Sequence, residues 1–572
     1  MDKEFNRWLS SPNVDGDTKN ELYNIKGNND EITSRFAAPL SFGTAGLRGI
    51  MRAGINGMNV YTVSQATEGL ARLIIDAGGK DKGVAIAYDS RNNSRLFAER
   101  AAEVLAYNNI KVYLFDSLRP TPELSFAVLH HGCIAGINIT ASHNPKEYNG
   151  YKVYWSDGAQ LPPEHASQVS AEMAKIDLLD VKRANLDDAI KAGIVTIIGS
   201  ETDSEYIKNV LACSINPDVI KEYGNSLNLV YTPLHGTGYK LVPEVLRLSG
   251  IDNLVVVPEQ SVPDGNFPTV VSPNPESREC FELSYDYIKK NNLPTNVIIA
   301  TDPDGDRLGV AVKVDDGSFI PLSGNQIGAI LVDYIIKARK AKGLLPQNAC
   351  AIRSVVSSTL FDKICVKNGV TPVSVLTGFK YIGEKIKEYA QTGEHTFIFG
   401  YEESQGFLSG GYVRDKDAVA ASLLIAEAAS YYKSKGKTLY DALCDIYAEY
   451  GYHDEITLSV TITGALPLEI MNEKMKAIRQ RGISEINSVS VALRGDFADG
   501  TMTDLVKGVT NNTNLPLSDM LYFGMTDGTT VIIRPSGTEP KVKAYILTNG
   551  KDSFETAKKL GEYKAAILKL FE

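Results

Sequence analysis

The sequence predicts an α/β protein with three similar mixed α/β domains and a C-terminal α+β domain. Three observations lead to this prediction. A strand–helix–strand–helix–strand pattern occurs three times, each occurrence ends in an unusually polar loop, and the final part of the chain begins with alternating strand character instead. The length of 572 residues also exceeds what one hydrophobic core serves, which agrees with several domains.

The repeats consist of short, continuous apolar runs with turn residues between them, which is typical of mostly parallel sheets covered by helices. The first repeat predicts strands at 84–90, 110–116 and 135–140 and helices at 94–107 and 123–131. The second predicts strands at 227–233, 254–258 and 296–301 and helices at 238–248 and 279–291. The third predicts strands at 350–356, 371–376 and 396–400 and helices at 358–367 and 380–389.

The remainder of the chain, from about residue 452, predicts a smaller α+β domain. Its expected strands are 455–463, 531–534 and 541–547, and its expected helix is 553–570. The stretches near 190–225, 316–325 and 448–456 are interpreted as possible linkers. We therefore expect domains at 1–205, 206–318, 319–452 and 453–572.

A polar loop follows the last strand of each repeat. The loops are 140–145 (Thr-Ala-Ser-His-Asn-Pro), 302–307 (Asp-Pro-Asp-Gly-Asp-Arg) and 401–404 (Tyr-Glu-Glu-Ser). Ligands of open α/β sheets bind at the carboxyl ends of the strands. We therefore expect the three loops to face one shared cleft.

The composition is that of a large cytoplasmic globular protein. A net charge of −10, from 59 basic and 69 acidic residues, disfavours a general nucleic-acid-binding protein. The six cysteines form no Cys-x-x-Cys pair, which favours reduced thiols over a disulfide framework. The first residues are charged where a signal peptide is apolar, and the chain has no apolar run of about 18 residues, so we expect no membrane association.

The first loop offers a nucleophile. Ser142 leaves the end of a strand beside His143, and we interpret it as a carrier of a phosphoryl group. The alternative is a turn serine that bonds only the backbone. Lys152 and Lys416 are candidates to handle a hydroxyl proton, although a lysine base needs a lowered pKa.

The second loop predicts a cation site. Asp302, Asp304 and Asp306 alternate, so they can converge on one ion in an extended loop, and oxygen ligands favour Mg²⁺. An EF-hand is excluded because its sixth position would be Arg307 and its twelfth Lys313. The alternative is a solvated acidic turn.

The remaining polar loops predict contacts to a phosphorylated sugar. Glu402 and Ser404 are suited to grip sugar hydroxyls. A loop near the C-terminus supplies a guanidinium, hydroxyls and a flexible backbone for a non-reacting phosphate. Its candidate residues are Arg534, Ser536, Gly537 and Thr538. Nucleophile, cation site and anion cradle together are the parts of metal-assisted phosphoryl transfer.

These four loops, in this order, resemble the active-site loops of the α-D-phosphohexomutases, the phosphoglucomutase and phosphomannomutase superfamily. Further stretches are also similar: 43–49 (Gly-Thr-Ala-Gly-Leu-Arg-Gly), 264–268 (Asp-Gly-Asn-Phe-Pro) and 377–380 (Thr-Gly-Phe-Lys). The resemblance runs from residue 43 to residue 545 and implies four domains around a central cleft. It also implies substrate contacts by Arg48, Arg307, Gly378 and Lys380.

The resemblance implies a mutase with one Mg²⁺ per chain, whose coordination a phosphoserine at Ser142 completes. His143 would orient or stabilise groups at the reacting phosphate. The phosphoserine would donate to a sugar hydroxyl, the bisphosphate would turn around, and Ser142 would recover the other phosphate. For glucose 1-phosphate and glucose 6-phosphate, the intermediate and activator would be glucose 1,6-bisphosphate. The expected partner is a small phosphosugar, and the chain would be a monomer or dimer.

Two departures from the family's pattern leave the choice of substrate open. Gln405 follows the sugar loop where some family members carry histidine, which favours glucose over mannose. Residues 146–152 look like the long bacterial phosphoglucomutases and the phosphopentomutase-like proteins, so pentose phosphates stay possible. A metal-dependent sugar phosphatase and a non-catalytic sugar-phosphate-binding protein are the rival classes, and phosphate release or the absence of any product would identify them.

Overall fold

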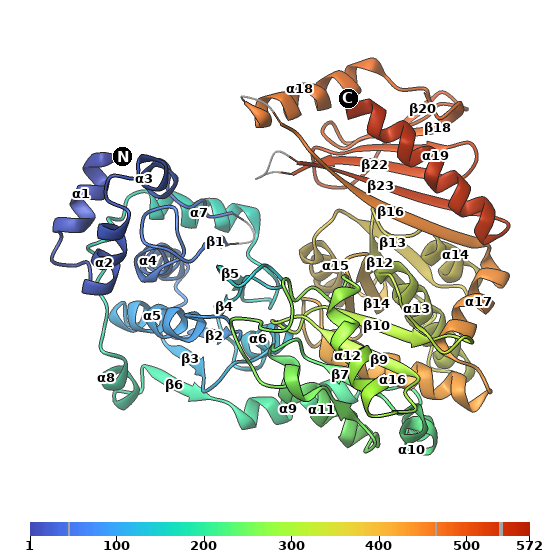
Figure 1. The fold of residues 1–572 in the computed structure, drawn as a ribbon, viewed down its shortest axis with the longest axis horizontal. Helices are drawn as coiled ribbons and strands as arrows, with labels where there is room; N and C mark the ends of the chain where they lie inside the picture. The colour runs from blue at the N-terminus through green and yellow to red at the C-terminus, as the bar shows by residue number, and fades with distance from the viewer. Residues whose placement is uncertain (44–45, 464–465, 537–540, 572) are drawn as a thin grey trace.

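The chain forms four β-sheets, each covered by helices, in a computed structural model that describes residues 1–43, 46–463, 466–536 and 541–571. In Figure 1 the first sheet and the N-terminal helices lie on one side of the molecule, and the other three sheets lie on the other side. The orange-to-red C-terminal sheet stacks on the third sheet. The predicted fold class, three mixed α/β units and a C-terminal α+β unit, is confirmed.

The first sheet has the strand order β1-β5-β4-β2-β3-β6. Strands β2, β3, β4 and β6 are parallel, and β5 runs antiparallel to β1 and β4. Every residue of β2 and β4 is buried, as expected for strands covered on both faces. The strands are β1 (Leu47–Ile50), β2 (Val84–Tyr88), β3 (Val112–Phe115), β4 (Ala135–Ile139), β5 (Tyr148–Trp155) and β6 (Val195–Ile198). The helices are α4 (Val60–Asp76), α5 (Ser94–Tyr107), α6 (Thr121–His130), α7 (Pro163–Met173) and α8 (Leu186–Lys191).

Three short helices precede this sheet and form a small apolar cluster together with Ala53, Tyr61 and Leu179. They are α1 (Asp2–Ser10), α2 (Gly16–Asn24) and α3 (Asn29–Phe36). Trp8 is completely buried and makes edge-to-face contacts with Phe36 and with Tyr61 of α4. These contacts attach the N-terminal helices to the first sheet.

The second sheet has the order β11-β10-β9-β7-β8. Its strands are β7 (Val230–Thr232), β8 (Val255–Val256), β9 (Val297–Thr301), β10 (Leu308–Lys313) and β11 (Phe319–Pro321). Its helices are α11 (Gly238–Ser249) and α12 (Glu279–Lys290), with short 3₁₀ turns η1 (Gly224–Leu227) and η2 (Pro258–Gln260).

The interpretation of 190–225 as a linker is wrong. This stretch contains β6, which pairs with β3, and two further helices, α9 (Ser200–Leu211) and α10 (Pro217–Tyr223). The buried carboxylate of Glu427 accepts hydrogen bonds from the backbone N–H groups of Ile215 and Asn216, which holds the stretch in place.

The third sheet has the order β13-β12-β14-β15, with parallel pairing except for β15. Its strands are β12 (Ala349–Ser354), β13 (Thr371–Val375), β14 (Thr396–Glu402) and β15 (Gly406–Leu408). Its helices are α13 (Gly324–Ala341), α14 (Leu360–Lys367), α15 (Phe379–Thr392), α16 (Ala418–Ser434) and α17 (Leu439–Tyr450). Ser323 and Gln326 form a capping box that fixes the start of α13.

The C-terminal sheet is antiparallel, with the order β16-β23-β22-β21-β18-β19-β20 and β17 paired to β18. Its strands are β16 (Tyr452–Thr461), β17 (Glu485–Ile486), β18 (Val489–Asp496), β19 (Thr501–Asp504), β20 (Val509–Asn512), β21 (Leu521–Met525), β22 (Thr530–Pro535) and β23 (Lys541–Gly550), and its helices are α18 (Pro467–Arg481) and α19 (Ser553–Phe571). An apolar cluster that includes Val356, Leu376, Phe497 and Tyr545 joins this sheet to the third one. Of the described helices, none is long and apolar enough to cross a membrane.

The polar loops at the ends of the three repeats are tips between antiparallel strands. After each loop the chain returns along the strand it has just left, so that β5 pairs with β4, β10 with β9, and β15 with β14. An isolated bridge between Arg307 and Gly406 also joins the second and third tips. Both ends of each loop are therefore held by a sheet, which fixes the loops in space.

Candidate active site

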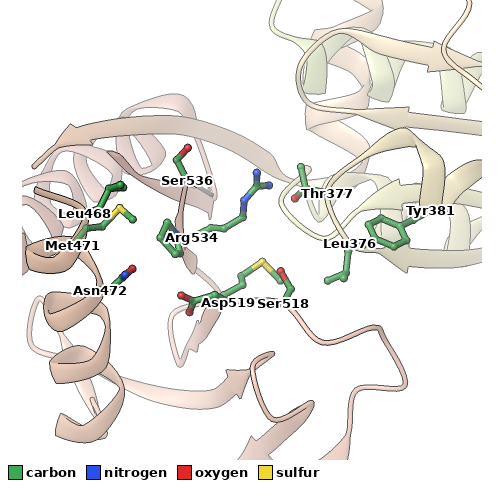
Figure 2. A pocket seen from close by; sticks show the side chains of 12 residues that line it. Leu376, Thr377, Tyr381, Leu468, Met471, Asn472, Ser518, Asp519, Arg534 and Ser536 are labelled. Atoms are coloured by element: carbon green, nitrogen blue, oxygen red, sulfur yellow. The ribbon is translucent and has the colours of Figure 1, made fainter. Parts of the chain in front are cut away.

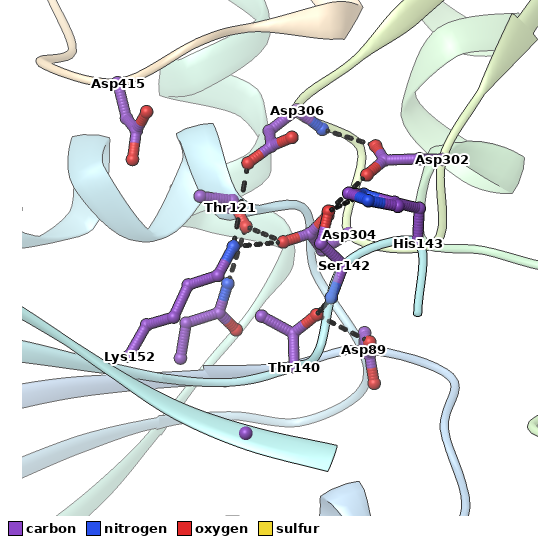
Figure 3. Close-up of polar contacts among 12 residues, drawn as sticks. Asp89, Thr121, Thr140, Ser142, His143, Lys152, Asp302, Asp304, Asp306 and Asp415 are labelled. Carbon is purple, nitrogen blue, oxygen red and sulfur yellow. Dashed lines mark hydrogen bonds and ion pairs between the residues drawn. The ribbon is translucent and has the colours of Figure 1, made fainter. Parts of the chain in front are cut away.

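Ser142 lies at the tip between β4 and β5 with a φ of 53°, in the left-handed region that non-glycine residues rarely occupy. Its side chain is buried, and Oγ donates a hydrogen bond of 2.7 Å to Asp302 Oδ2 and lies 3.2 Å from His143 Nδ1 (Figure 3). The backbone N–H of Ser142 donates to Thr140 Oγ1, which in turn donates to Asp89. The unusual backbone conformation, which costs roughly 1–3 kcal/mol, therefore aims the hydroxyl at the second loop.

Arg91 holds this loop together, and the sequence analysis missed it. The side chain is completely buried and pairs with Asp89 at 3.2 Å between Nε and Oδ2. Its two terminal nitrogens donate to the carbonyl oxygens of Ser142, Asn144, Pro145 and Tyr148. One guanidinium thus fixes four carbonyls around the nucleophile. The signal was present as Asp-Ser-Arg directly after β2, but such a tripeptide is common in turns.

The three predicted aspartates converge at the tip between β9 and β10. One oxygen of each of Asp302, Asp304 and Asp306 lies within 4.8 Å of the others, and all three side chains are buried. Gly305 has a φ of 66°, and a Cβ there would come within 2.8 Å of Pro120 Cβ, so glycine is required for the turn. Burial, together with the charges of Asp304 and Asp306, raises the pKa of Asp302 well above its usual range.

The aspartate cluster fits a divalent cation. Oδ1 of Asp304 and Oδ1 of Asp306 are buried and have no hydrogen-bond partner among the described residues. Three carboxylates forced together without partners for these oxygens are costly unless a positive charge is bound there. The donor set, which contains only oxygen, suits a hard cation such as Mg²⁺ or Mn²⁺.

Both predicted lysines reach the aspartates. Lys152 of β5 places Nζ 2.7 Å from Asp304 Oδ2, and Lys416 places Nζ 3.2 Å from Asp306 Oδ2. Burial lowers the pKa of Lys416, but the charges of Asp306 and Asp415 outweigh this effect, and the net pKa is raised. This direction is the opposite of the one a lysine base needs.

Asp415 connects the two lysines to further polar side chains. Asp415 accepts hydrogen bonds from Lys416 Nζ at 3.0 Å and from Tyr154 Oη at 2.8 Å. Tyr154 lies two residues after Lys152 on β5, so both side chains leave the same face of the strand. Residues of the first, second and third sheets thereby meet in one buried network.

His143 is held as a neutral imidazole. Burial, with the nearby cations Arg307 and Arg48, lowers its pKa to about 2. Arg48, predicted to contact substrate, lies on β1 and donates to Asn144 Oδ1 at 3.2 Å. Arg307 forms an ion pair with Glu276, with 2.6 Å between Nη1 and Oε1. Glu276 was not predicted from the sequence.

The third loop combines a buried carboxylate, Glu402, with a half-buried one, Glu403. Glu402 ends β14 instead of following it and accepts a hydrogen bond of 2.7 Å from the backbone N–H of Gly378. Glu403 accepts from Ser354 Oγ at 2.9 Å. Burial raises the pKa of Glu402 from 4.5 to about 7 despite the charge of Lys416.

A cavity of about 450 Å³ brings most of the predicted loops together. It opens between the second, third and C-terminal sheets. Its wall carries side chains from the predicted site, namely His143, Arg307, Ser404 and Arg534, and side chains that were not predicted, namely Glu276, Glu403, Gln405, Lys543 and Tyr545. Lys543 faces Arg534 across the β22–β23 pairing, so two cations lie on the wall formed by the C-terminal sheet.

A second cavity of about 490 Å³ shares Thr377 and Arg534 with the first. Figure 2 shows Arg534 extending toward Thr377, with Ser536 beside it and residues of α18 on the other side. Lys380 lies over the ring of Tyr381 instead, at 4.8 Å from its centroid. Gly537 and Thr538, predicted for the phosphate cradle, lie outside the described residues.

Comparisons with known proteins agree with this architecture. Models of the phosphoglucomutase/phosphomannomutase alpha/beta/alpha domains I, II and III match residues 39–180, 204–316 and 323–450. A phosphoglucomutase of Staphylococcus epidermidis is 36% identical over 543 residues, which cover 95% of this chain and 96% of that protein. A phosphoglucomutase of Staphylococcus aureus is 36% identical over 569 residues, which cover 98% of each chain.

Solved structures share the fold. The phosphoglucomutase pp63/parafusin of Paramecium, in an open form, superposes with a TM-score of 0.68 at 18% identity and covers 93% of this chain and 95% of its own. A phosphoglucomutase/phosphomannomutase family protein of Burkholderia thailandensis gives a TM-score of 0.63 at 17% identity, with 92% and 97% coverage. The resemblance inferred from the loop motifs is confirmed, and the chain belongs to the phosphoglucomutase/phosphomannomutase family of phosphosugar mutases.

Proposed function

We propose that the protein is a phosphoglucomutase that interconverts glucose 1-phosphate and glucose 6-phosphate. The observation that carries this proposal is the position of Ser142. Its hydroxyl lies 2.7 Å from Asp302 of the buried aspartate cluster, and the cavity lined by its neighbour His143 is also lined by Arg534 and Lys543. A reacting centre and a separate anion site are what a bisphosphorylated intermediate requires.

In the proposed reaction, a phosphoserine at Ser142 donates its phosphoryl group to the free hydroxyl of the sugar phosphate. The bond between phosphorus and the serine oxygen breaks while the sugar oxygen bonds to phosphorus, and the hydroxyl proton leaves to a base. Lys152 and Lys416 stay the candidates for this base, although the raised pKa of Lys416 disfavours it. The product of this step is glucose 1,6-bisphosphate. It turns around, and the other phosphoryl group returns to Ser142 by the reverse chemistry.

Asp302, Asp304 and Asp306 would hold one Mg²⁺, which offsets negative charge on the group being transferred. Arg534, Lys543 and Ser536 would hold the phosphate that does not react. Glu402 and Ser404 would accept hydrogen bonds from sugar hydroxyls common to both orientations of the bisphosphate. The four domains would span 1–205, 206–318, 319–452 and 453–572, with one active-site loop in each.

Comparison of sugar phosphates tests the substrate assignment. We expect kcat/KM for glucose 1-phosphate to exceed that for mannose 1-phosphate, N-acetylglucosamine phosphate and ribose 1-phosphate by about tenfold or more, because a misplaced hydroxyl leaves buried polar groups unpaired. A preference for mannose or ribose phosphate would overturn the glucose assignment but not the phosphoserine mechanism. Release of inorganic phosphate instead of an isomerised ester would identify a phosphatase.

The pH profile should report Glu402. Its pKa of about 7 means that the carboxyl gains a proton as the pH falls below 7 and loses an acceptor for sugar hydroxyls. We therefore expect KM to rise between pH 7 and pH 6 in the wild type, and this extra rise to be absent in Glu402→Gln, which retains the titration of the substrate phosphate. Because the folded state raises this pKa above 4.5, the wild-type free energy of unfolding should also fall relative to the glutamine variant as pH rises through this window. Identical KM profiles for the two proteins would show that Glu402 does not bind substrate through its ionised form.

A further inference from the structure

Thr121 joins the first sheet domain to the cation loop by two contacts with one residue. It is completely buried at the start of α6. Its backbone N–H donates to the carbonyl oxygen of Asp304 at 2.8 Å, and its Oγ1 donates to Asp304 Oδ2 at 2.9 Å (Figure 3). The two residues are 183 positions apart in the sequence, so this contact exists only in the folded chain.

The hydrogen bonds of Asp304 separate the roles of its two oxygens. Oδ2 accepts from Thr121 Oγ1 and also from Lys152 Nζ at 2.7 Å, and two donors use the acceptor capacity of one carboxylate oxygen. Oδ1 is buried without a hydrogen-bond partner among the described residues. The carboxylate is therefore fixed in a rotamer that leaves one specified oxygen for a cation.

Asn138 sets the direction of the threonine hydroxyl. Its Nδ2 donates to Thr121 Oγ1 at 2.7 Å, so the hydroxyl hydrogen must point away from Asn138. The hydroxyl donates to Oδ2 of Asp304. Asn138 lies on β4, four residues before Ser142 and opposite Lys152 in the β4–β5 pairing, so one strand pair positions both the nucleophile and the metal ligand.

We propose that Thr121, oriented by Asn138, is a positioning residue that presents Oδ1 of Asp304 to the divalent cation. The inference rests on the cation site of the proposed function and goes beyond it, because it assigns control of a metal ligand to a residue of another domain. Groups that orient a ligand from outside the coordination sphere typically contribute 10–100-fold to metal affinity. The backbone N–H of Thr121 at the start of α6 also holds the main-chain carbonyl of Asp304, so that the main chain and the side chain of this ligand are both fixed.

Mn²⁺ binding to the full-length protein tests this proposal without any turnover. Mn²⁺ is added to wild type, Thr121→Val and Thr121→Ser, and the free ion is measured by electron paramagnetic resonance. Intact mass confirms that the three proteins carry the same degree of phosphorylation. Valine keeps the branched shape and loses the hydroxyl, whereas serine keeps the hydroxyl. We expect the Kd for Mn²⁺ to rise about tenfold or more in the valine variant and to stay within about threefold of wild type in the serine variant.

One further measurement and one further variant separate positioning from general stability. At saturating metal, the KM for sugar phosphate in Thr121→Val should match wild type, because the sugar loops are untouched. If the valine variant does not fold, Thr121→Ala supplies the same measurement without a branched side chain. A wild-type Kd in folded valine or alanine variants would overturn the proposal.

The outcome is separable from that of the proposed function. Weaker Mn²⁺ binding in the valine variant of a protein that isomerises no sugar phosphate would support the positioning role and reject the mutase assignment. Normal mutase activity of the wild type, with an unchanged Kd for Mn²⁺ in the valine variant, would support the mutase assignment and reject the positioning role. Absence of Mn²⁺ binding in wild type would overturn the positioning role together with the cation site.

Discussion

Ser142→Ala is expected to reduce mutase activity by roughly 1,000-fold or more, because it removes the group that carries the phosphoryl between substrate positions. The fold should persist, since among the described residues the side chain makes hydrogen bonds only to Asp302 and His143, and a serine contributes little apolar packing. An isomerisation assay measures the activity. Intact mass should show about 80 Da of extra mass on wild type and none on the variant, because one phosphoryl group is lost.

A serine outside the cleft provides the control. Ser167 is exposed on α7, and its hydroxyl donates a hydrogen bond to the carbonyl oxygen of Pro163. Ser167→Ala should keep both the activity and the added mass. Activity of Ser142→Ala within tenfold of wild type, or an added mass that survives in it, would reject Ser142 as the phosphoryl carrier.

Removal of divalent metal should lower mutase activity almost as much as Ser142→Ala does. Exhaustive chelation with EDTA is expected to lower activity by about 100-fold or more, and added Mg²⁺ should restore it, because the transferred group then lacks its counter-charge. Asp304→Asn should raise the Mg²⁺ concentration needed for half-maximal activity, because one ligand loses its negative charge. The metal content of the protein before and after chelation, measured by mass spectrometry, gives the occupancy.

A carboxylate away from the site controls for the loss of charge. Asp316 is exposed in the turn before β11. Asp316→Asn should leave the metal requirement unchanged. Full activity of a chelated protein that retains no metal would show that the three aspartates form only an acidic turn.

The parallel strands and their helices could be predicted because each is defined locally, by an apolar run or by helical periodicity. The antiparallel strands β5, β10 and β15 were missed because the repeat was read as ending at its polar loop. Their residues are apolar enough for strands, but a single sequence does not show that a chain turns back to pair with the strand it has just left. The error at 190–225 has the same cause, because β6 is a strand only through its pairing with β3, which the sequence does not show.

In the candidate site, residues with unusual local chemistry could be predicted from the sequence, whereas the residues that hold them in position could not. Three alternating aspartates and a serine before His-Asn-Pro are rare in sequence, and the structure brings Ser142 and Asp302 into contact. Thr121 and Glu276 act through partners far away in the sequence, so nothing beside them in the chain marks them. Arg91 has one partner nearby, Asp89, but the four carbonyl oxygens that it binds lie more than 50 residues away. Lys543 is one of many lysines until β23 pairs with β22 and places it opposite Arg534.

The contacts between the four domains differ in kind. Lys152 with Asp304, and Tyr154 with Asp415, join the first three domains through buried charged groups whose geometry is strict, since a small displacement leaves a charge unpaired. The C-terminal domain meets the third through an apolar cluster, a kind of contact that has no preferred direction, and through a hydrogen bond from Ser323 Oγ to Glu455 Oε1 on β16. Mechanically, the molecule should therefore behave as two rigid bodies with a hinge near β16. The room in which a bisphosphate can rotate would then come from the second body swinging away, while the reacting centre stays assembled in the first.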